Sequence, residues 1–178
     1  LQATLCELAH DGKVVYHGHL AQELLSGIAH VLKVLLTAPM EFRVKQVRAR
    51  QNLSDPAARH YIEAVDNARS RRLMAMFGID WRDPNRYDLV LNVGKMSREG
   101  AQRLIVEAAK LEEYQPTAES SRAFNDLALA SRVHATLIAA REIRGSALAI
   151  RAAEDHIHVS GRIQPGLEGE VVRLAKHV

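Results

Sequence analysis

Short apolar runs alternate with stretches of helical periodicity over the first two thirds of the chain. Residues 13–18, 31–38 and 87–93 are nearly continuous apolar runs, a pattern typical of strands buried on both faces. Between and around them the spacing of apolar residues predicts helices at 1–10, 19–27, 41–51, 55–77 and 97–111. Strands that alternate with helices in this way predict an α/β fold with a parallel sheet.

The pattern changes after the fifth of these helices. Residues 112–124 are polar and contain Pro116, which predicts a linker. Residues 125–142 have the periodicity of an amphipathic helix, and residues 168–178 predict a final helix. Between them, two runs that alternate with period two around Glu154-Asp155 predict a hairpin. This part of the chain therefore predicts a small α+β unit.

Positive charge is concentrated in one segment. Residues 41–72 contain eight Lys or Arg and four Asp or Glu, a net charge of +4, whereas the whole chain carries +3. A local basic segment indicates a local anionic partner. The alternative is a solvated helix face on which arginines pair with acids such as Glu63 or Asp66, for example as the i, i+3 pair Asp66-x-x-Arg69.

Composition limits the class of protein. The chain has 178 residues, 47% of them hydrophobic, which suits one ordinary domain or two small ones. Cys6 is the only cysteine, so no internal disulfide is expected, and a reducing compartment fits. No signal peptide or long apolar run is present, and we expect a cytoplasmic location. Because the chain starts at Leu1 without Met, we expect a processed product or a fragment.

Two histidine pairs raise the question of a metal. His17 with His19 and His156 with His158 could each place two ligands on one face of a strand. Two ligands are too few, and no nearby carboxylate or cysteine pattern completes a site, so we predict no metal. His156 and His158 are instead expected on the solvent face of the hairpin. Nucleic acid is not expected either, because aromatic residues are only 4% and no recognition motif appears.

Four stretches in residues 1–111 carry a family resemblance. They are VVYHGH, VLKVLLTAPMEFRVKQV, the DNAR of Asp66-x-x-Arg69, and DWRDPNRYDLVLNV. In this order they resemble the second half of a cytidylate kinase-like protein, a member of the P-loop nucleoside monophosphate kinases. The resemblance implies that the basic helical pair is a lid whose arginines close over nucleotide phosphates. The lid-like positions are Arg43, Arg48, Arg50, Asp66 and Arg69. Trp81 and Tyr87 are expected to pack in the core or a loop.

The resemblance also implies ATP and Mg²⁺ as cofactors, but the sequence departs from the family at two places. It contains no Gly-x-x-x-x-Gly-Lys-[Ser/Thr], which the family carries on its first strand, upstream of residue 1 here. The family's acceptor-side Gly-Arg pair is Gly18-His19 in this chain, and histidine is a poorer phosphate ligand. The parallel sheet is therefore expected to lack its middle strand. That strand could come from an upstream portion of the protein, from another chain or from a rearranged sheet, and we favour an upstream portion. The SREG at 97–100 is interpreted as a helix N-cap.

Residues 125–178 resemble a BON domain. The resemblance rests on the helix, the run ALAIRAAEDHIHVSGRI with Ser160-Gly161 at the family's turn glycine, and the helix ending LAKHV. The family normally adds a strand after that helix, so this end also resembles a truncation. BON domains are associated with phospholipid surfaces and with oligomer contacts, which makes both candidate interactions here.

We interpret the chain as a bacterial cytidylate kinase-like α/β domain (1–111), a linker (112–124) and a BON-like α+β domain (125–178). The leading hypothesis is a non-catalytic module that responds to a nucleotide or another phosphorylated small molecule. The first alternative is an active CMP-type phosphotransferase whose phosphate loop lies upstream. The second is an assembly or scaffolding protein that forms homo-oligomers.

Overall fold

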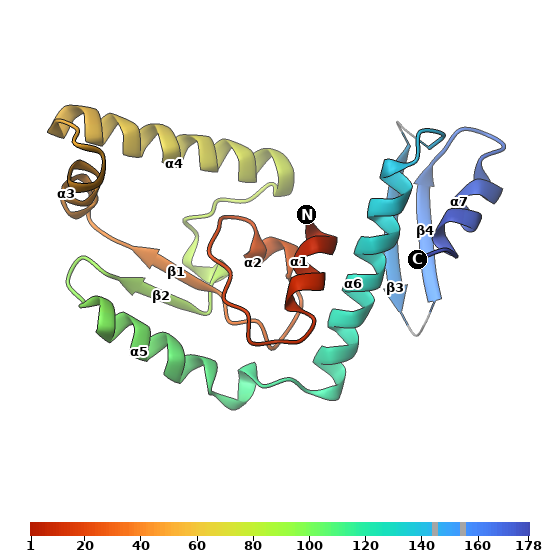
Figure 1. Cartoon of the computed structure of the whole chain (residues 1–178), viewed down its shortest axis with the longest axis horizontal. Coiled ribbons are helices and arrows are strands. Elements are labelled where there is room, and N and C mark those ends of the chain that lie inside the picture. The colour runs from red at the N-terminus through yellow and green to blue at the C-terminus, as the bar shows by residue number, and fades with distance from the viewer. Residues whose placement is uncertain (144–145, 154–155) are drawn as a thin grey trace. The chain divides into compact units, whose positions relative to one another are not determined.

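The structure is a computed structural model that describes residues 1–143, 146–153 and 156–178 (Figure 1). It forms two compact units. The central unit is Gly18–Gln115, and the terminal unit combines Leu1–His17 with Pro116–Val178.

The central unit is built on two parallel strands. β1 (Val34–Thr37) pairs with β2 (Leu89–Asn92) in register, so that Val34 lies beside Leu89 and Thr37 beside Asn92. The predicted parallel α/β arrangement is therefore confirmed for the second and third apolar runs. The helices of this unit are α2 (Ala21–Leu24), α3 (Met40–Gln51), α4 (Asp55–Phe77) and α5 (Arg98–Ala109), with 3-10 turns η1 (Pro84–Arg86) and η2 (Glu112–Tyr114).

The bounds of α3, α4 and α5 agree with the predicted helices because their end signals are strong. Pro56 lies in the first turn of α4, where proline costs no hydrogen bond, and Gly78 ends the helix with a φ of 68°. Ser97 caps α5 by accepting a hydrogen bond from the Gly100 amide at 3.0 Å. Ser54 precedes α4 as predicted, but its side chain makes no capping hydrogen bond. A small core of Val44, Ala58 and Ile62 joins α3 to α4.

The strand predicted at residues 13–18 is wrong. No strand forms there, Lys13 has a φ of 57°, and the Val15 side chain is 97% exposed. A strand is stable only when a neighbouring strand satisfies its backbone groups. Within the described residues β1 and β2 pair only with each other, so this apolar run has no partner to form a ladder with.

The terminal unit packs a hairpin against helices. β3 (Ala147–Ala153) pairs antiparallel with β4 (His156–Arg162), as predicted, while the Glu154-Asp155 turn lies outside the described residues. Inward side chains such as Ile150 and Val159 pack on a core of Val133, Leu137, Ile143 and Val171. His156 and His158 lie on the exposed face, which confirms their predicted orientation. The other elements are α6 (Ala118–Ala139), α7 (Glu168–Ala175) and α1 (Gln2–Ala9).

Two features of the terminal unit differ from expectation. α6 begins at Ala118, seven residues before the predicted helix, because Thr117 and Ser120 form a capping box with reciprocal hydrogen bonds of 3.0 Å. Gly161 lies inside β4 opposite Leu148 and not in a turn.

α1 packs against α6 with Leu5 and Cys6 buried. No helix of the described residues is long and apolar enough to span a membrane.

Candidate anion-binding site

The two helices of the basic segment are joined by a bidentate ion pair. Arg43 of α3 donates from Nη1 to Oδ2 of Asp66 at 2.7 Å and from Nη2 to Oδ1 at 2.9 Å. The Asp66 side chain is 9% exposed and that of Arg43 is 33% exposed. Burial raises the pKa of Asp66, but hydrogen bonds and the charge of Arg43, with Arg69 and Arg82 nearby, hold that pKa below its usual value.

Arg69, one turn further along α4, lies in a different environment. Its Nη2 donates to Nε2 of His19 across 3.1 Å, and its guanidinium carbon lies 4.4 Å from the centroid of the Trp81 ring. Its Nε is buried and makes no hydrogen bond within the described residues. Burial lowers the pKa of Arg69, partly offset by the charge of Asp66. Since Arg43 occupies the Asp66 carboxylate, Arg69 is a partly buried cation with no carboxylate of the described residues hydrogen-bonded to it.

Trp81 is held in place by the loop between α4 and β2. Its indole Nε1 donates to Oγ of Ser70 at 3.0 Å, and the Tyr87 hydroxyl donates to the Trp81 carbonyl at 2.8 Å. Burial is the main cause that raises the pKa of Tyr87. The guanidinium of Arg82 lies 5.0 Å from the indole centroid, so two guanidinium groups contact one ring.

His19 lies just before α2, and α2 is held in place by an ion pair between Glu23 and Arg86. Glu23 accepts hydrogen bonds from Nε of Arg86 at 3.1 Å and from Nη2 at 2.6 Å. Gln22 donates to the His19 carbonyl at 3.2 Å, while Gly18 is exposed in the preceding bend. These contacts fix the backbone that presents His19 to α4.

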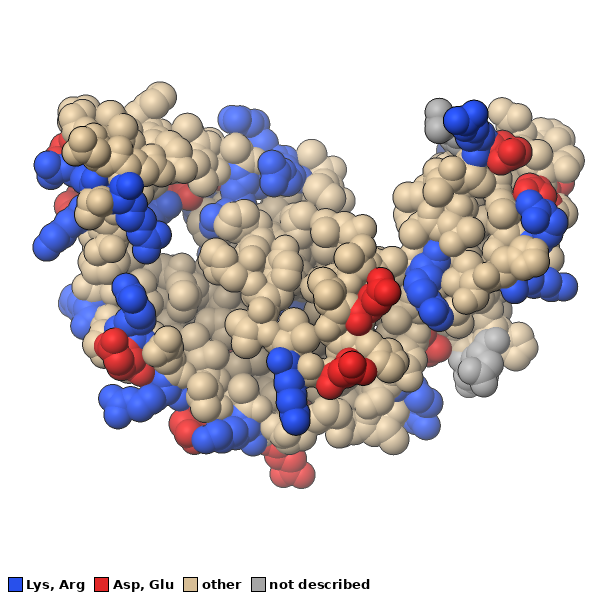
Figure 2. All heavy atoms as spheres, in the orientation of Figure 1, with Lys and Arg blue, Asp and Glu red and all other residues tan. Residues whose placement is uncertain are grey.

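We call the residues around the indole ring and the buried carboxylate the Arg69 cluster. Its members are His19, Arg43, Asp66, Arg69, Trp81 and Arg82. The cluster contains three guanidinium groups and one carboxylate, an excess of positive charge that favours an anion. Figure 2 shows the wider setting, in which Lys and Arg side chains lie over α3 and α4 and also along α5.

The structure brings together only part of the predicted lid-like set. Arg43, Asp66 and Arg69 lie in the cluster with the predicted acceptor-side residue His19. Arg48 instead pairs with Asp55 at 2.5 Å, and both side chains are more than half exposed. Arg50 is exposed at the end of α3 without a hydrogen bond or ion pair to the described residues. The alternative that an arginine of the segment pairs with Asp66 is confirmed, but the partner is Arg43 of the neighbouring helix and not Arg69 at i+3.

Trp81 and Arg82 were not predicted as site residues. Trp81 does pack in a loop, as expected, but its ring also makes a cation–π contact with the guanidinium of Arg69. The sequence signal was the DWRDPNR segment, whose aromatic residue and arginine follow α4 closely in the chain. Nothing in the spacing alone specifies that this loop folds back onto Ser70.

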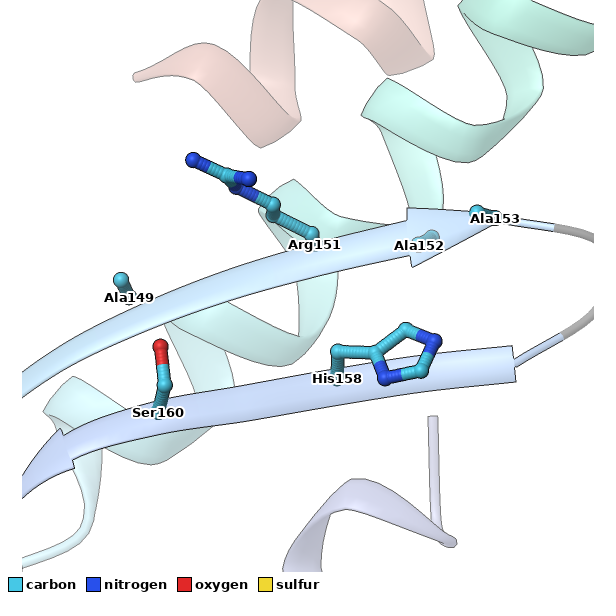
Figure 3. Close-up of a pocket in the computed structure, with 6 residues that line it drawn as sticks. All are labelled: Ala149, Arg151, Ala152, Ala153, His158 and Ser160. Carbon is cyan, nitrogen blue, oxygen red and sulfur yellow. The ribbon is translucent and has the colours of Figure 1, made fainter.

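Two hollows away from the Arg69 cluster are weaker candidates. A shallow cavity of about 500 Å³ lies on the exposed face of the hairpin, where Arg151 is opposite His158 and Ala149 is opposite Ser160 (Figure 3). A smaller one of about 290 Å³ lies beside Lys45 and Asn52. No described residue that lines either hollow has a buried side-chain polar atom without a partner. Among the residues that the structure describes, no group of three or more His, Cys, Asp or Glu could hold a metal ion.

Comparison with other proteins places these residues in a family. The model of the cytidylate kinase-like family matches residues 1–95. Similar proteins include the cytidylate kinases of Staphylothermus marinus (36% identical over 101 residues, 57% of this chain and 56% of that protein) and Pyrococcus horikoshii (35% over 103 residues, 58% and 52%). The cytidylate kinase of Methanopyrus kandleri is 32% identical over 101 residues, covering 52% of each.

A solved structure shares the fold. An uncharacterized protein from Eubacterium ventriosum superimposes with a TM-score of 0.57 at 19% identity, covering 61% of this chain and 62% of that one. The present chain spans just over half the length of the cytidylate kinases that it matches. With the parallel β1–β2 pair, the basic helices and a family match over more than half of its residues, the chain belongs to the cytidylate kinase-like family.

Proposed function

We propose that the chain is a nucleotide-responsive module that binds the phosphate group of a nucleotide, or of another phosphorylated small molecule, at the Arg69 cluster. One observation carries the proposal: the Arg69 guanidinium is partly buried, and among the described residues its Nε has no hydrogen-bond partner and no carboxylate hydrogen-bonds to it. Burying a charge without a hydrogen-bonded counter-ion costs free energy, which a bound anion would offset.

The residues take different roles in this proposal. Arg69 contacts the phosphate, with Gly18 and His19 forming the acceptor side of the site. The Arg43–Asp66 pair positions the two helices and directs both hydrogen bonds of the Asp66 carboxylate to Arg43. Arg48 and Arg50 supply further positive charge from α3 when the helices close over the ligand. The stacked Trp81 keeps the Arg69 guanidinium oriented.

The test is calorimetric titration of the chain with CMP and with ATP, each with Mg²⁺. Arg69→Ala is expected to abolish saturable binding. Arg59→Ala is the matched control, because Arg59 lies on the same helix but is exposed and pairs with Glu41 at 3.3 Å. No binding to either nucleotide by the folded wild-type chain would overturn the proposal.

ATP and Mg²⁺ are the cofactors that the family implies. The Arg69 cluster suits a phosphate group, but the 178 residues contain no glycine-rich phosphate loop and the described residues offer no carboxylate cluster for the metal. We therefore assign no phosphotransfer step to these residues, and propose that they act without catalysis as they stand.

A second candidate is an active CMP-type phosphotransferase. It is favoured by the relatives named as cytidylate kinases, of which the chain spans only about half. The phosphate loop would then belong to the part of those proteins that the chain does not span. Transfer of the γ-phosphate from ATP to CMP by the natural full-length protein, and loss of transfer in Arg69→Ala, would establish it.

The proposal includes a kinase-like domain, a short linker and a BON-like domain in the cytoplasm as the output part, but the linker ends before α6 begins at Ala118 and not at residue 124 as predicted. The order of α6, β3, β4 and α7 supports it. The exposed hairpin face carries Arg151 and His158, which suits contact with phospholipid headgroups. Homo-oligomer formation, a scaffolding role, is the remaining alternative, favoured by exposed apolar side chains such as Leu36 and Met74. Vesicle co-sedimentation tests the phospholipid contact, and sedimentation velocity tests the formation of homo-oligomers.

A further inference from the structure

The hydrogen bond between Arg69 and His19 fixes a protonation state. A guanidinium group has only donors, so Nη2 of Arg69 must donate and Nε2 of His19 must accept across their 3.1 Å contact. An imidazole that accepts at Nε2 is neutral, with its proton on Nδ1. In the arrangement seen here, neutral His19 therefore satisfies one of the Arg69 donors.

The charges that act on Arg69 come from several elements. α4 contributes Arg69 and Asp66, α3 contributes Arg43, and the loop after α4 contributes Arg82. Tyr87 lies near Arg69 from the segment before β2.

Two of the local carboxylates are already engaged by arginines. Asp66 is bound to Arg43, and Glu23, four residues after His19, is bound to Arg86. A proton added to His19 would place a second cation beside the guanidinium of Arg69.

Protonation of His19 changes both partners at once. The imidazolium can no longer accept from Arg69, and two adjacent cations repel each other. An anion with several acceptor oxygens resolves this conflict, because Arg69 and protonated His19 can then both donate to it. A doubly charged tetrahedral oxyanion matches the two cations in charge and in number of acceptors.

We propose that anion binding at Arg69 is proton-linked through His19: the site takes the dianionic phosphate group of a phosphomonoester, and His19 gains a proton as it binds. The inference rests on the proposed function and names its regulation. Because the bound anion stabilises the protonated imidazole, it raises the pKa of His19. For an anion whose own charge does not change, affinity is therefore highest at low pH and falls as the pH rises above the pKa of the unliganded histidine.

The test uses inorganic sulfate as the probe, because its charge stays constant where phosphate itself titrates. Sulfate affinity of the full chain is measured by calorimetry at several values between about pH 5.5 and about pH 8. The wild type is expected to lose affinity by up to roughly tenfold per pH unit above about pH 6.5. His19→Gln keeps a polar side chain that does not titrate, so its affinity should be nearly independent of pH.

His60→Gln is the control, since His60 is an exposed histidine on α4 outside the cluster, and it should keep the wild-type dependence. An equal pH dependence in wild type and His19→Gln would overturn the inference while leaving the anion site intact. Absence of sulfate binding at every pH would overturn the proposed function together with it. If His19→Gln does not fold, the NMR titration of His19 in the wild type decides: its pKa must rise on addition of sulfate, and an unchanged pKa refutes the linkage.

Discussion

Arg43 and Asp66 are 23 residues apart in the sequence and form a two-pronged ion pair that joins α3 to α4, with distances of 2.7 and 2.9 Å. The pair matters for two reasons. It fixes the relative orientation of the two basic helices next to their small apolar core. It also takes up both oxygens of the only carboxylate in the Arg69 cluster, so that among the described residues no carboxylate hydrogen-bonds to Arg69. The stability of this unit and the proposed anion binding therefore depend on the same contact.

Removal of Arg43 is expected to destabilise the central unit. In Arg43→Ala the Asp66 carboxylate stays buried without its bidentate partner, which costs about 2 kcal/mol in the free energy of unfolding. Urea denaturation followed by the fluorescence of Trp81, the single tryptophan of the chain, measures this unit. Arg48→Ala is the matched control on α3, because its pair with Asp55 is exposed and should contribute less than about 1 kcal/mol. Equal losses in the two variants would contradict a special role for Asp66.

The same pair predicts a pH dependence of stability. The pKa of Asp66 is lower in the folded protein than in the unfolded chain. The ionised carboxylate therefore contributes its full stabilisation above the unfolded-state pKa of about 4. This contribution is lost as the pH falls through the lower pKa of the folded state. Asp66→Asn should therefore be less stable than wild type at about pH 7, and the difference should shrink below about pH 4. Denaturation midpoints at several pH values measure it, with the exposed Asp55→Asn as control. A constant difference down to about pH 2 would show that the Asp66 charge is not responsible.

Much of the central unit could be predicted from the sequence where signals are local. The ends of α4 follow from Pro56 and Gly78, and the β1–β2 pairing follows from two apolar runs separated by helices. The prediction of a strand at residues 13–18 was wrong because apolar character shows only that a segment is suited to a sheet. Whether a partner strand lies beside it is a property of the fold, and the exposed Val15 shows that none does within the described residues.

The site shows the same division between local and non-local information. The resemblance singled out Arg69 and His19 as candidate site residues, and the structure places them in contact. It could not indicate that Arg43 binds Asp66, or that Trp81 folds back to stack on Arg69. These contacts join positions that are distant in the sequence, and their geometry depends on how α3, α4 and the following loop pack.

Replacement of Arg69 by lysine should weaken nucleotide binding while the fold is kept. Lysine retains the charge but loses the planar fork and the stack on Trp81, so the affinity for CMP is expected to fall at least about tenfold. Calorimetry measures the affinity, and Trp81 emission should change on addition of CMP in the wild type but not in the variant. Arg59→Lys, an exposed site on the same helix, should leave both readouts unchanged. Wild-type affinity in Arg69→Lys would mean that only the net charge of the segment matters.

Gly161 should be essential to the hairpin of the terminal unit. It has a φ of 139°, and a Cβ placed there would lie 2.0 Å from the carbonyl oxygen of Ala147 on the neighbouring strand. The carbonyl oxygen is a backbone atom and the position of a Cβ is set by the backbone, so a rotamer change cannot relieve this clash. Gly161→Ala is expected to cost at least about 2 kcal/mol and to shift the β3–β4 register.

Gly169→Ala provides the comparison for that variant. Gly169 lies in α7, and a methyl group on its Cα would meet no other atom within 4 Å, so alanine there should be neutral or stabilise by up to about 1 kcal/mol. Thermal unfolding followed by far-ultraviolet circular dichroism measures both variants, and amide hydrogen exchange in β3 and β4 reports the hairpin directly. Unchanged protection of these strands in Gly161→Ala would mean that the backbone at this position tolerates a side chain, and that the close approach to Ala147 does not hold the register.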